Sequence, residues 1–249
     1  MRNMGAQLYT VRNTLTTTEE IKHTLKAIKE IGYHSVQLFG STELIENCAG
    51  CAEETGLEIV GILTDIKTCE SHESKLFEIC GKYHILDIGV SSSFSECRDP
   101  DAYITRVNAF AEKAKKAGCT FSYHNHGHEF VKLDCGETAM NLFLQGFHSE
   151  TVDFMPDTYW IQDGGYDVRY FLEQTKNRVK ILHLKDMKRM EQGHTFTEVG
   201  NGNLYFEGII KTAIHCGIKS FVAEQDICEG DPIESLRKSY KYMKRLLEN

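Results

Sequence analysis

A joint between helix and strand recurs along this sequence and constrains its fold more than any other feature. Four amphipathic segments end at a glycine that is followed at once by an apolar run: Ile31-Gly32-Tyr33, Thr55-Gly56-Leu57, Ala117-Gly118-Cys119 and Cys216-Gly217-Ile218. Glycine commonly ends helices because it adopts the left-handed conformation without strain. The same joint at four places indicates a repeated helix–strand unit, so parallel strands with right-handed crossovers are expected.

Eight apolar, β-branched runs have the length of buried strands. They are predicted at residues 5–9, 35–39, 58–63, 85–90, 120–124, 151–155, 179–184 and 220–224. Amphipathic helices are predicted between them, for example at 17–31, 43–54, 99–117, 166–174, 206–216 and 233–247. Thr17 and Glu20 have the spacing of a capping box at the start of the first helix.

Eight such units predict an α/β fold in which residues 1–249 form a single (β/α)8 TIM barrel domain with parallel strands. The length of 249 residues is close to the usual size of this barrel. An open doubly wound sheet is the alternative, and it would often carry a glycine-rich loop after its first strand. Because Thr10-Val11-Arg12 follows the first strand here, the barrel is favoured.

The composition limits the classes of partner. The net charge is −8, whereas nucleic-acid binding depends mainly on clustered Lys and Arg, so no nucleic-acid partner is expected. No stretch approaches the ~20 apolar residues of a membrane span. No signal-peptide apolar region opens the chain, so a cytoplasmic protein without a membrane partner is expected.

The cysteines are predicted to be free thiols. There are nine, an odd number at irregular spacings, which fits a reducing compartment. Cys48 and Cys51 form a C-x-x-C, but they fall inside a predicted helix and lack the second pair that a structural zinc site would need. They are therefore expected to be ordinary helix residues.

Polar side chains gather where the last four strands end, and in a barrel these ends form the face that carries the chemistry. Strand five leads into His124, His126 and Glu129, and the later strands lead into Asp157, His183-Leu184-Lys185-Asp186 and Glu224-Gln225-Asp226. Each residue alone has an ordinary explanation: a strand-end histidine usually packs, Asp157 could cap a turn, and Glu224 could pair with a lysine. Together, converging carboxylates repel one another unless a cation lies between them. We therefore expect a divalent metal at this face.

The same motifs resemble a known superfamily over almost the whole chain. Tyr123-His124-Asn125-His126, Glu129-Phe130, Asp157-Thr158-Tyr159-Trp160, His183-Leu184-Lys185-Asp186, Glu224-Gln225-Asp226 and Gln7-Leu8-Tyr9-Thr10-Val11-Arg12 resemble the xylose isomerase-like barrels. Within that superfamily they are most similar to the group called sugar phosphate isomerases/epimerases. The resemblance identifies the superfamily more firmly than the substrate.

The resemblance implies one divalent metal ion (Mn, Zn, Co or Mg), held by two glutamates, an aspartate and a histidine. Carried over to this sequence, its ligands are Glu129, Asp157, His183 and Glu224. The strand-five corner stays open, because Glu129 lies five residues beyond the predicted strand end and His124 or His126 could reach the ion instead.

The resemblance also implies a mechanism. Glu129 and Glu224 would be the catalytic acid/base pair of a metal-dependent isomerase or epimerase that acts on a sugar, keto-sugar or sugar phosphate through a metal-stabilised enediolate. The alternative is a lyase or dehydratase acting on an inosose or a 3-keto-glycoside. A noncatalytic sugar-binding barrel is a third hypothesis, and a repair endonuclease conflicts with the acidic charge.

The remaining candidate residues would bind the small-molecule sugar or keto-sugar substrate. They are His124, His126, Trp160 and Lys185, of which Trp160 could form an apolar wall against a sugar ring. Asp186 is expected to orient His183. The loop at 199–204 could offer backbone N–H groups to an anion, although Asn-Gly favours a plain turn. Barrels of this group often pair, so a homodimer stays open.

Overall fold

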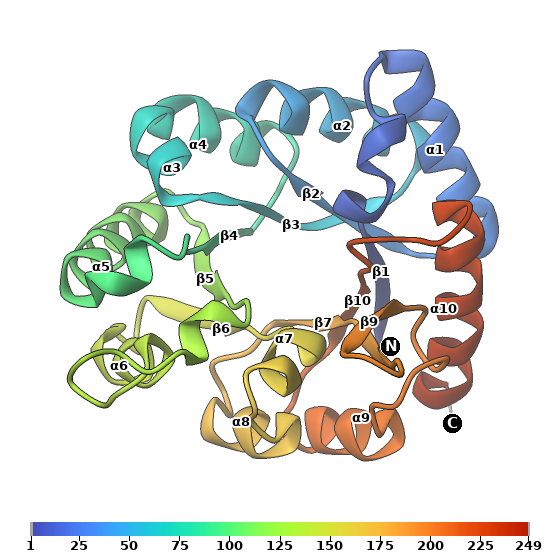
Figure 1. Cartoon of the computed structure of the whole chain (residues 1–249). Helices are drawn as coiled ribbons and strands as arrows, with labels where there is room; N and C mark the ends of the chain where they lie inside the picture. Colours follow the sequence, from blue (N-terminus) through green and yellow to red (C-terminus); the bar gives the residue numbers. More distant parts are fainter. Residues whose placement is uncertain (1, 249) are drawn as a thin grey trace.

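Eight parallel strands form a nearly closed ring in the computed structural model, which describes residues 2–248 (Figure 1). Their order around the ring is β6-β5-β4-β3-β2-β1-β10-β7. The strands are β1 (Asn3–Gln7), β2 (Ser35–Phe39), β3 (Glu58–Asp65), β4 (Asp87–Ser91), β5 (Thr120–His124), β6 (Val152–Met155), β7 (Ile181–Leu184) and β10 (Ser220–Ala223). Two isolated parallel bridges, Phe154 to Val179 and Asp157 to His183, join β6 to β7 and complete the ring. The predicted barrel is therefore confirmed.

Helices surround the strands on the outside of the ring (Figure 1). They are α1 (Thr18–Ile31), α2 (Thr42–Thr55), α3 (Ile66–Ser71), α4 (Glu73–Lys82), α5 (Pro100–Lys116), α6 (Ala139–Gly146), α7 (Thr158–Asp163), α8 (Val168–Gln174), α9 (Phe206–His215) and α10 (Pro232–Leu247). Short 3-10 turns follow or precede some of them: η1 (Leu8–Thr14), η2 (Glu96–Arg98) and η3 (His128–Phe130). Within residues 2–248, none of these helices combines the length and apolarity that crossing a bilayer requires.

The local signals of the sequence are confirmed at the helix ends. Thr17 and Glu20 form the predicted capping box at the start of α1. All four joint glycines have positive φ, from 69° at Gly56 to 118° at Gly32. Cys48 and Cys51 are free and buried in α2, where burial raises the pKa of Cys48 to about 12. They therefore act as ordinary packing residues.

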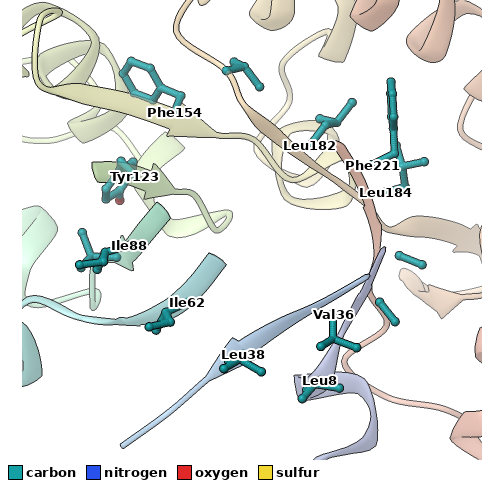
Figure 2. Packing of buried hydrophobic residues seen from close by; sticks show 14 of the residues in the cluster. Leu8, Val36, Leu38, Ile62, Ile88, Tyr123, Phe154, Leu182, Leu184 and Phe221 are labelled. Atoms are coloured by element: carbon teal, nitrogen blue, oxygen red, sulfur yellow. The ribbon is translucent and has the colours of Figure 1, made fainter. Parts of the chain in front are cut away.

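Alternation along each strand separates the core from the barrel interior. Leu182 and Leu184 of β7 point away from the ring axis into the layer under the helices, as do Val36 and Leu38 of β2 (Figure 2). The residue between the two leucines, His183, points to the opposite side because side chains alternate along a strand. The interior is thus left to polar residues toward the ends of the strands.

An antiparallel hairpin after β7 was not predicted. It consists of β8 (Asp186–Arg189) and β9 (His194–Thr197), which pair only with each other. Lys188 and Arg189 are exposed, so the segment lacks the apolar alternation by which a strand is recognised. The hairpin brings Phe196 beside α7, where its ring stacks on Tyr159 at 4.4 Å between centroids.

Candidate functional site

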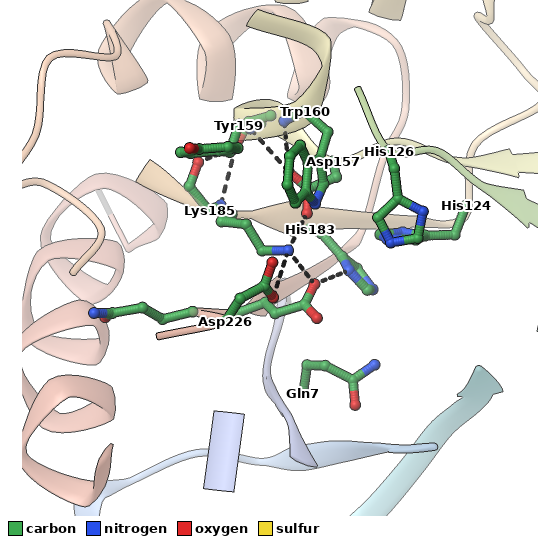
Figure 3. Close-up of polar contacts among 12 residues, drawn as sticks. Gln7, His124, His126, Asp157, Tyr159, Trp160, His183, Lys185 and Asp226 are labelled. Atoms are coloured by element: carbon green, nitrogen blue, oxygen red, sulfur yellow. Dashed lines mark hydrogen bonds and ion pairs between the residues drawn. The ribbon is translucent and has the colours of Figure 1, made fainter. Parts of the chain in front are cut away.

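Four buried side chains converge where the last strands of the ring end. They are His124, Asp157, His183 and Glu224, called here the four-residue group, and each offers a ligand atom within 4.8 Å of the others. Figure 3 shows three of them beside Lys185. Their strands β5, β6, β7 and β10 lie side by side, and the register aligns His124 with Met155 and Val222 with His183. The strand ends therefore deliver one side chain each to the same place.

Asp157 performs two tasks with separate oxygens. Its Oδ1 caps α7 by accepting from the backbone N–H groups of Tyr159 at 2.8 Å and Trp160 at 3.1 Å. Its Oδ2 is buried without a well-aligned hydrogen bond and lies 2.9 Å from Lys185 Nζ. The turn-capping explanation of Asp157 is thus correct, and it leaves one carboxylate oxygen for the site.

A series of hydrogen bonds that begins at the backbone determines that Nε2 of His183 carries a hydrogen. The N–H of Tyr9 donates to Gln7 Oε1, so the other end of that amide, Nε2, donates to Gln37 Oε1 at 2.8 Å. Gln37 Oε1 is then an acceptor, and His183 Nε2, 2.6 Å away, must donate to it.

The other nitrogen of His183 faces an acceptor. Nδ1 lies 2.7 Å from Glu224 Oε2, and a lone pair there would oppose a carboxylate oxygen. Two electron-rich atoms this close need a proton or a metal cation between or beside them. The contact therefore requires either a proton on Nδ1 or a cation beside the two atoms.

Lys185 supplies one buried positive charge to this end of the barrel. Its Nζ lies 2.9 Å from Asp157 Oδ2, 3.3 Å from Glu224 Oε2 and 2.9 Å from Asp226 Oδ1 (Figure 3). Burial would lower the pKa of Lys185, but the three carboxylates outweigh burial and raise it. Burial raises the pKa of Asp157. The ammonium group of Lys185 opposes this rise only in part, because it also pairs with Glu224 and Asp226.

The donor set fits a divalent cation. Three carboxylates face one ammonium, so the carboxylates outnumber the lysine that pairs with them. His124 adds a neutral nitrogen ligand. Burial and the nearby His183 hold the pKa of His124 well below its ordinary value. His124 Nδ1 lies 3.2 Å from the carbonyl of Met155 and donates to it, so Nε2 keeps its lone pair for a ligand.

Glu129 does not join the four-residue group. Its Oε1 accepts from Tyr123 Oη at 2.7 Å and Ser92 Oγ at 3.2 Å, and both carboxylate oxygens lie 3.0 Å from the backbone N of His126. A separate cluster combines Glu129 with His126 and His128. The structure therefore places the two glutamates named by the resemblance apart, and it places His124 beside Asp157, His183 and Glu224.

A cavity of about 470 Å³ opens onto the four-residue group. Its walls include His124, His126, Trp160, Glu224 and Asp226. Burial lowers the pKa of His126 to about 3, so its ring is neutral and can exchange hydrogen bonds with a ligand. Lys185 is absent from this wall, since its side chain is only 1% exposed and directed at carboxylates. Of the residues expected to bind substrate, His124, His126 and Trp160 border the cavity.

Asp186 and the loop at 199–204 form hydrogen bonds with each other. The carboxylate of Asp186 accepts from the backbone N–H groups of Gly200, Gly202 and Leu204. The loop thus presents its N–H groups to an anion, but the anion is a side chain of the same protein. Asp186 makes no hydrogen bond with His183 in the described chain, and Gln37 has the orienting role that was expected of Asp186. The signal for Gln37 was a long polar side chain inside an otherwise apolar stretch of a buried strand.

The sequence is similar to a known protein family and to curated relatives. The family model for the xylose isomerase-like TIM barrel matches residues 25–246. An inosose dehydratase of Mesomycoplasma hyopneumoniae is 26% identical over 163 residues, which cover 57% of this chain and 52% of the relative. The chain thus spans about half the length of the curated relatives it matches.

Solved structures share the fold over nearly the full length. A sugar phosphate isomerase/epimerase from Parabacteroides distasonis has a TM-score of 0.80 at 22% identity, covering 98% of this chain and 93% of the other. D-psicose 3-epimerase from Clostridium cellulolyticum, solved with D-tagatose, has a TM-score of 0.75 at 13% identity, covering 99% of both chains. Given the family match over most of its length, this chain belongs to the xylose isomerase-like TIM barrel family.

Proposed function

We propose that this protein is a divalent-metal-dependent isomerase that acts on a small sugar or keto-sugar. The observation that carries the proposal is the four-residue group, which borders a cavity. Its carboxylates outnumber Lys185, the buried lysine that pairs with them. The similar proteins include an inosose dehydratase, a sugar phosphate isomerase/epimerase and a D-psicose 3-epimerase, and these relatives support the substrate class.

The proposed metal ligands are His124, Asp157, His183 and Glu224. Mn²⁺, Zn²⁺, Co²⁺ or Mg²⁺ held there would stabilise the negative charge that develops on substrate oxygens during proton removal. Trp160 offers an apolar face to the sugar ring, and His126 offers a neutral imidazole to a hydroxyl group. These residues would orient the substrate against Glu224.

Glu224 is the proposed base. Its Oε2 is engaged by His183 and Lys185, while no described residue bonds to Oε1, and Glu224 borders the cavity. Burial would raise the pKa of Glu224, but Lys185 and His183 outweigh burial and hold it well below its ordinary value, so the carboxylate is ionised. Oε1 can therefore accept a proton from a carbon beside the substrate carbonyl.

One base suffices for isomerisation. When Oε1 takes the proton, the C–H electron pair becomes the double bond of an enediolate, and the carbonyl electron pair moves onto the carbonyl oxygen. Returning the proton to the former carbonyl carbon, while the hydroxyl proton passes from its own oxygen to the former carbonyl oxygen, moves the carbonyl by one position. No oxidant or reductant is consumed. Epimerisation needs a second group on the opposite face of the substrate, and the engaged carboxylate of Glu129 favours the isomerase over the epimerase.

A dehydratase is the second candidate. The inosose dehydratases among the relatives favour it, and the first step would be the same proton removal by Glu224. The intermediate would then expel the hydroxyl group of the next carbon, which takes the proton held by Glu224 and leaves as water, and the product is an enone. An isomerase gives no such ultraviolet absorbance, so the product separates the two candidates.

Hydrogen exchange with heavy water tests the proposal. The protein with Mn²⁺ or Co²⁺ is incubated with a panel of ketoses, aldoses, inososes and keto-sugars, and carbon-bound deuterium is measured by NMR. We expect exchange with at least one sugar, and Glu224→Gln should slow it about 10²- to 10⁴-fold. Glu207→Gln, on the surface of α9, is the matched control and should exchange normally. Sugar binding without exchange would overturn the enzymatic assignment in favour of a binding protein.

A further inference from the structure

A second cavity adjoins the catalytic one on the same face of the barrel. Its volume is about 580 Å³, and its walls come from the segment between β4 and α5 and the segment between β5 and α6. Both segments follow the ends of their strands, as the catalytic residues do. The two cavities share no wall residue, but a pair of stacked histidine rings lies between them, because His126 borders the first and His128 borders the second.

A continuous series of aromatic rings runs from one cavity to the other. Trp160 and His126 are 5.6 Å apart between ring centroids, His126 and His128 stack at 5.4 Å, and His128 and Phe94 meet edge to face at 6.2 Å. Phe94 ends the series at the outer cavity with 48% of its surface exposed. We call these four residues the aromatic path. Ring faces of this kind suit the apolar faces of sugar rings.

The outer cavity also offers polar groups without partners. Arg98, Lys132 and Asp134 are exposed on its wall, and none forms a side-chain hydrogen bond or ion pair within the part of the chain described. Arg98 lies over the ring of Phe94 at 5.0 Å. Because cations and carboxylates are mixed on this wall, it suits hydroxyl groups better than a phosphate.

We propose that the outer cavity binds the second ring of a glycoside whose first ring lies against Glu224. The inference rests on the proposed function and adds a substrate class to it: a two-ring sugar whose first ring supplies the carbonyl beside which Glu224 acts, with its linkage crossing the His126–His128 stack. The catalytic cavity, about 470 Å³, has room for the reacting ring, and the outer cavity, about 580 Å³, has room for a second one. The second ring would meet the exposed Phe94 on one side and the polar side chains of the wall on the other.

The fluorescence of Trp160, the only tryptophan, provides the test because it lies at the inner end of the path. With Mn²⁺ present, the protein is titrated with single-ring sugars (glucose and fructose) and two-ring ligands (phenyl β-glucoside, cellobiose and lactulose), and calorimetry checks each affinity. We expect at least one two-ring ligand to bind about tenfold more tightly than its single-ring counterpart, as one added aromatic contact allows.

Phe94→Ala should remove this difference while leaving the affinity for the single-ring sugar within about twofold. Tyr170→Ala, which removes an aromatic ring that is 55% exposed on α8, is the matched control and should keep the difference. Equal affinities for one and two rings would overturn the outer subsite and leave the proposed function intact. A Phe94→Ala loss that is equal for both ligand sizes would also overturn it. Binding of neither size, together with no hydrogen exchange, would overturn both proposals.

Discussion

At the scale of single residues, Lys185 is the most constrained cation in the barrel. Its ammonium group is buried among Asp157, Glu224 and Asp226, two of which are proposed metal ligands. Removing one partner of a buried ion pair leaves uncompensated charge, which typically costs about 3–5 kcal/mol. We expect Lys185→Met to lower the free energy of unfolding by an amount in this range in metal-free buffer, measured by urea denaturation.

The same variant should depend on metal. Since the ammonium no longer competes for the carboxylates, added Mn²⁺ should restore much of the lost stability, and calorimetry should show tighter Mn²⁺ binding than in the unmodified protein. Lys238→Met, which removes an exposed pair with Glu198, is the control and should change neither quantity appreciably. A Lys185→Met protein that is as stable as the original without metal would contradict this account.

Asp87 gives a prediction about pH. It is buried in β4, where Thr120 and Ser122 donate to Oδ1 and Oδ2 has no partner; burial raises its pKa to about 6. Between the ordinary pKa of an aspartate, which holds in the unfolded state, and the raised pKa in the native state, the native state binds more protons than the unfolded state. Asp87 therefore makes the free energy of unfolding fall as pH rises from about 4 to 6. Asp87→Asn should remove this slope and stabilise the protein at pH 7 by up to about 3 kcal/mol. Urea denaturation from pH 4 to 7 measures it, and an unchanged slope would contradict it.

At the scale of elements, the hairpin β8–β9 packs against α7 next to the site. Phe196 of the hairpin stacks on Tyr159 and lies 5.6 Å from Trp160 between ring centroids. Without that ring, the hairpin loses its main apolar contact with α7, so Phe196→Ala should let it open more often. Trypsin should then cut after the exposed Lys188 or Arg189 several-fold faster, detected by mass spectrometry. Tyr205→Ala, outside the hairpin, should leave the rate unchanged; equal rates for both variants would contradict the role of Phe196.

The elements also show what the sequence could and could not predict. Strand and helix positions were predictable because the apolar period and the terminal signals are local, as at Thr17 and Gly32. The hairpin was not, since its strands are short and polar. The grouping of Asp157, His183 and Glu224 followed from the strand ends. The place of Glu129 did not, because η3 turns its carboxylate toward Tyr123 and Ser92, a contact between βα segments that no periodicity encodes.

At the scale of the whole molecule, the ring has a weak closure at the place where the site lies. In the described chain, strands β6 and β7 share no continuous ladder, and their backbones pair through two isolated bridges, of which one is Asp157 to His183. These two residues belong to the four-residue group, so a shared cation would hold the two sides of the closure together. Metal binding should therefore stabilise the barrel as a unit as well as equip it for chemistry.

Thermal unfolding with and without metal tests this link. A metal at a hundred times its dissociation constant adds about 2.7 kcal/mol, which for a chain of this size raises Tm by about 5–10 °C over the EDTA-treated protein. The rise should disappear in Asp157→Asn and in His124→Gln, which remove proposed ligands on β6 and β5. It should persist in Glu129→Gln, whose carboxylate is engaged elsewhere. If Glu129→Gln abolishes the rise and His124→Gln keeps it, the fourth ligand is the glutamate and the loop after β5 must rearrange when metal binds.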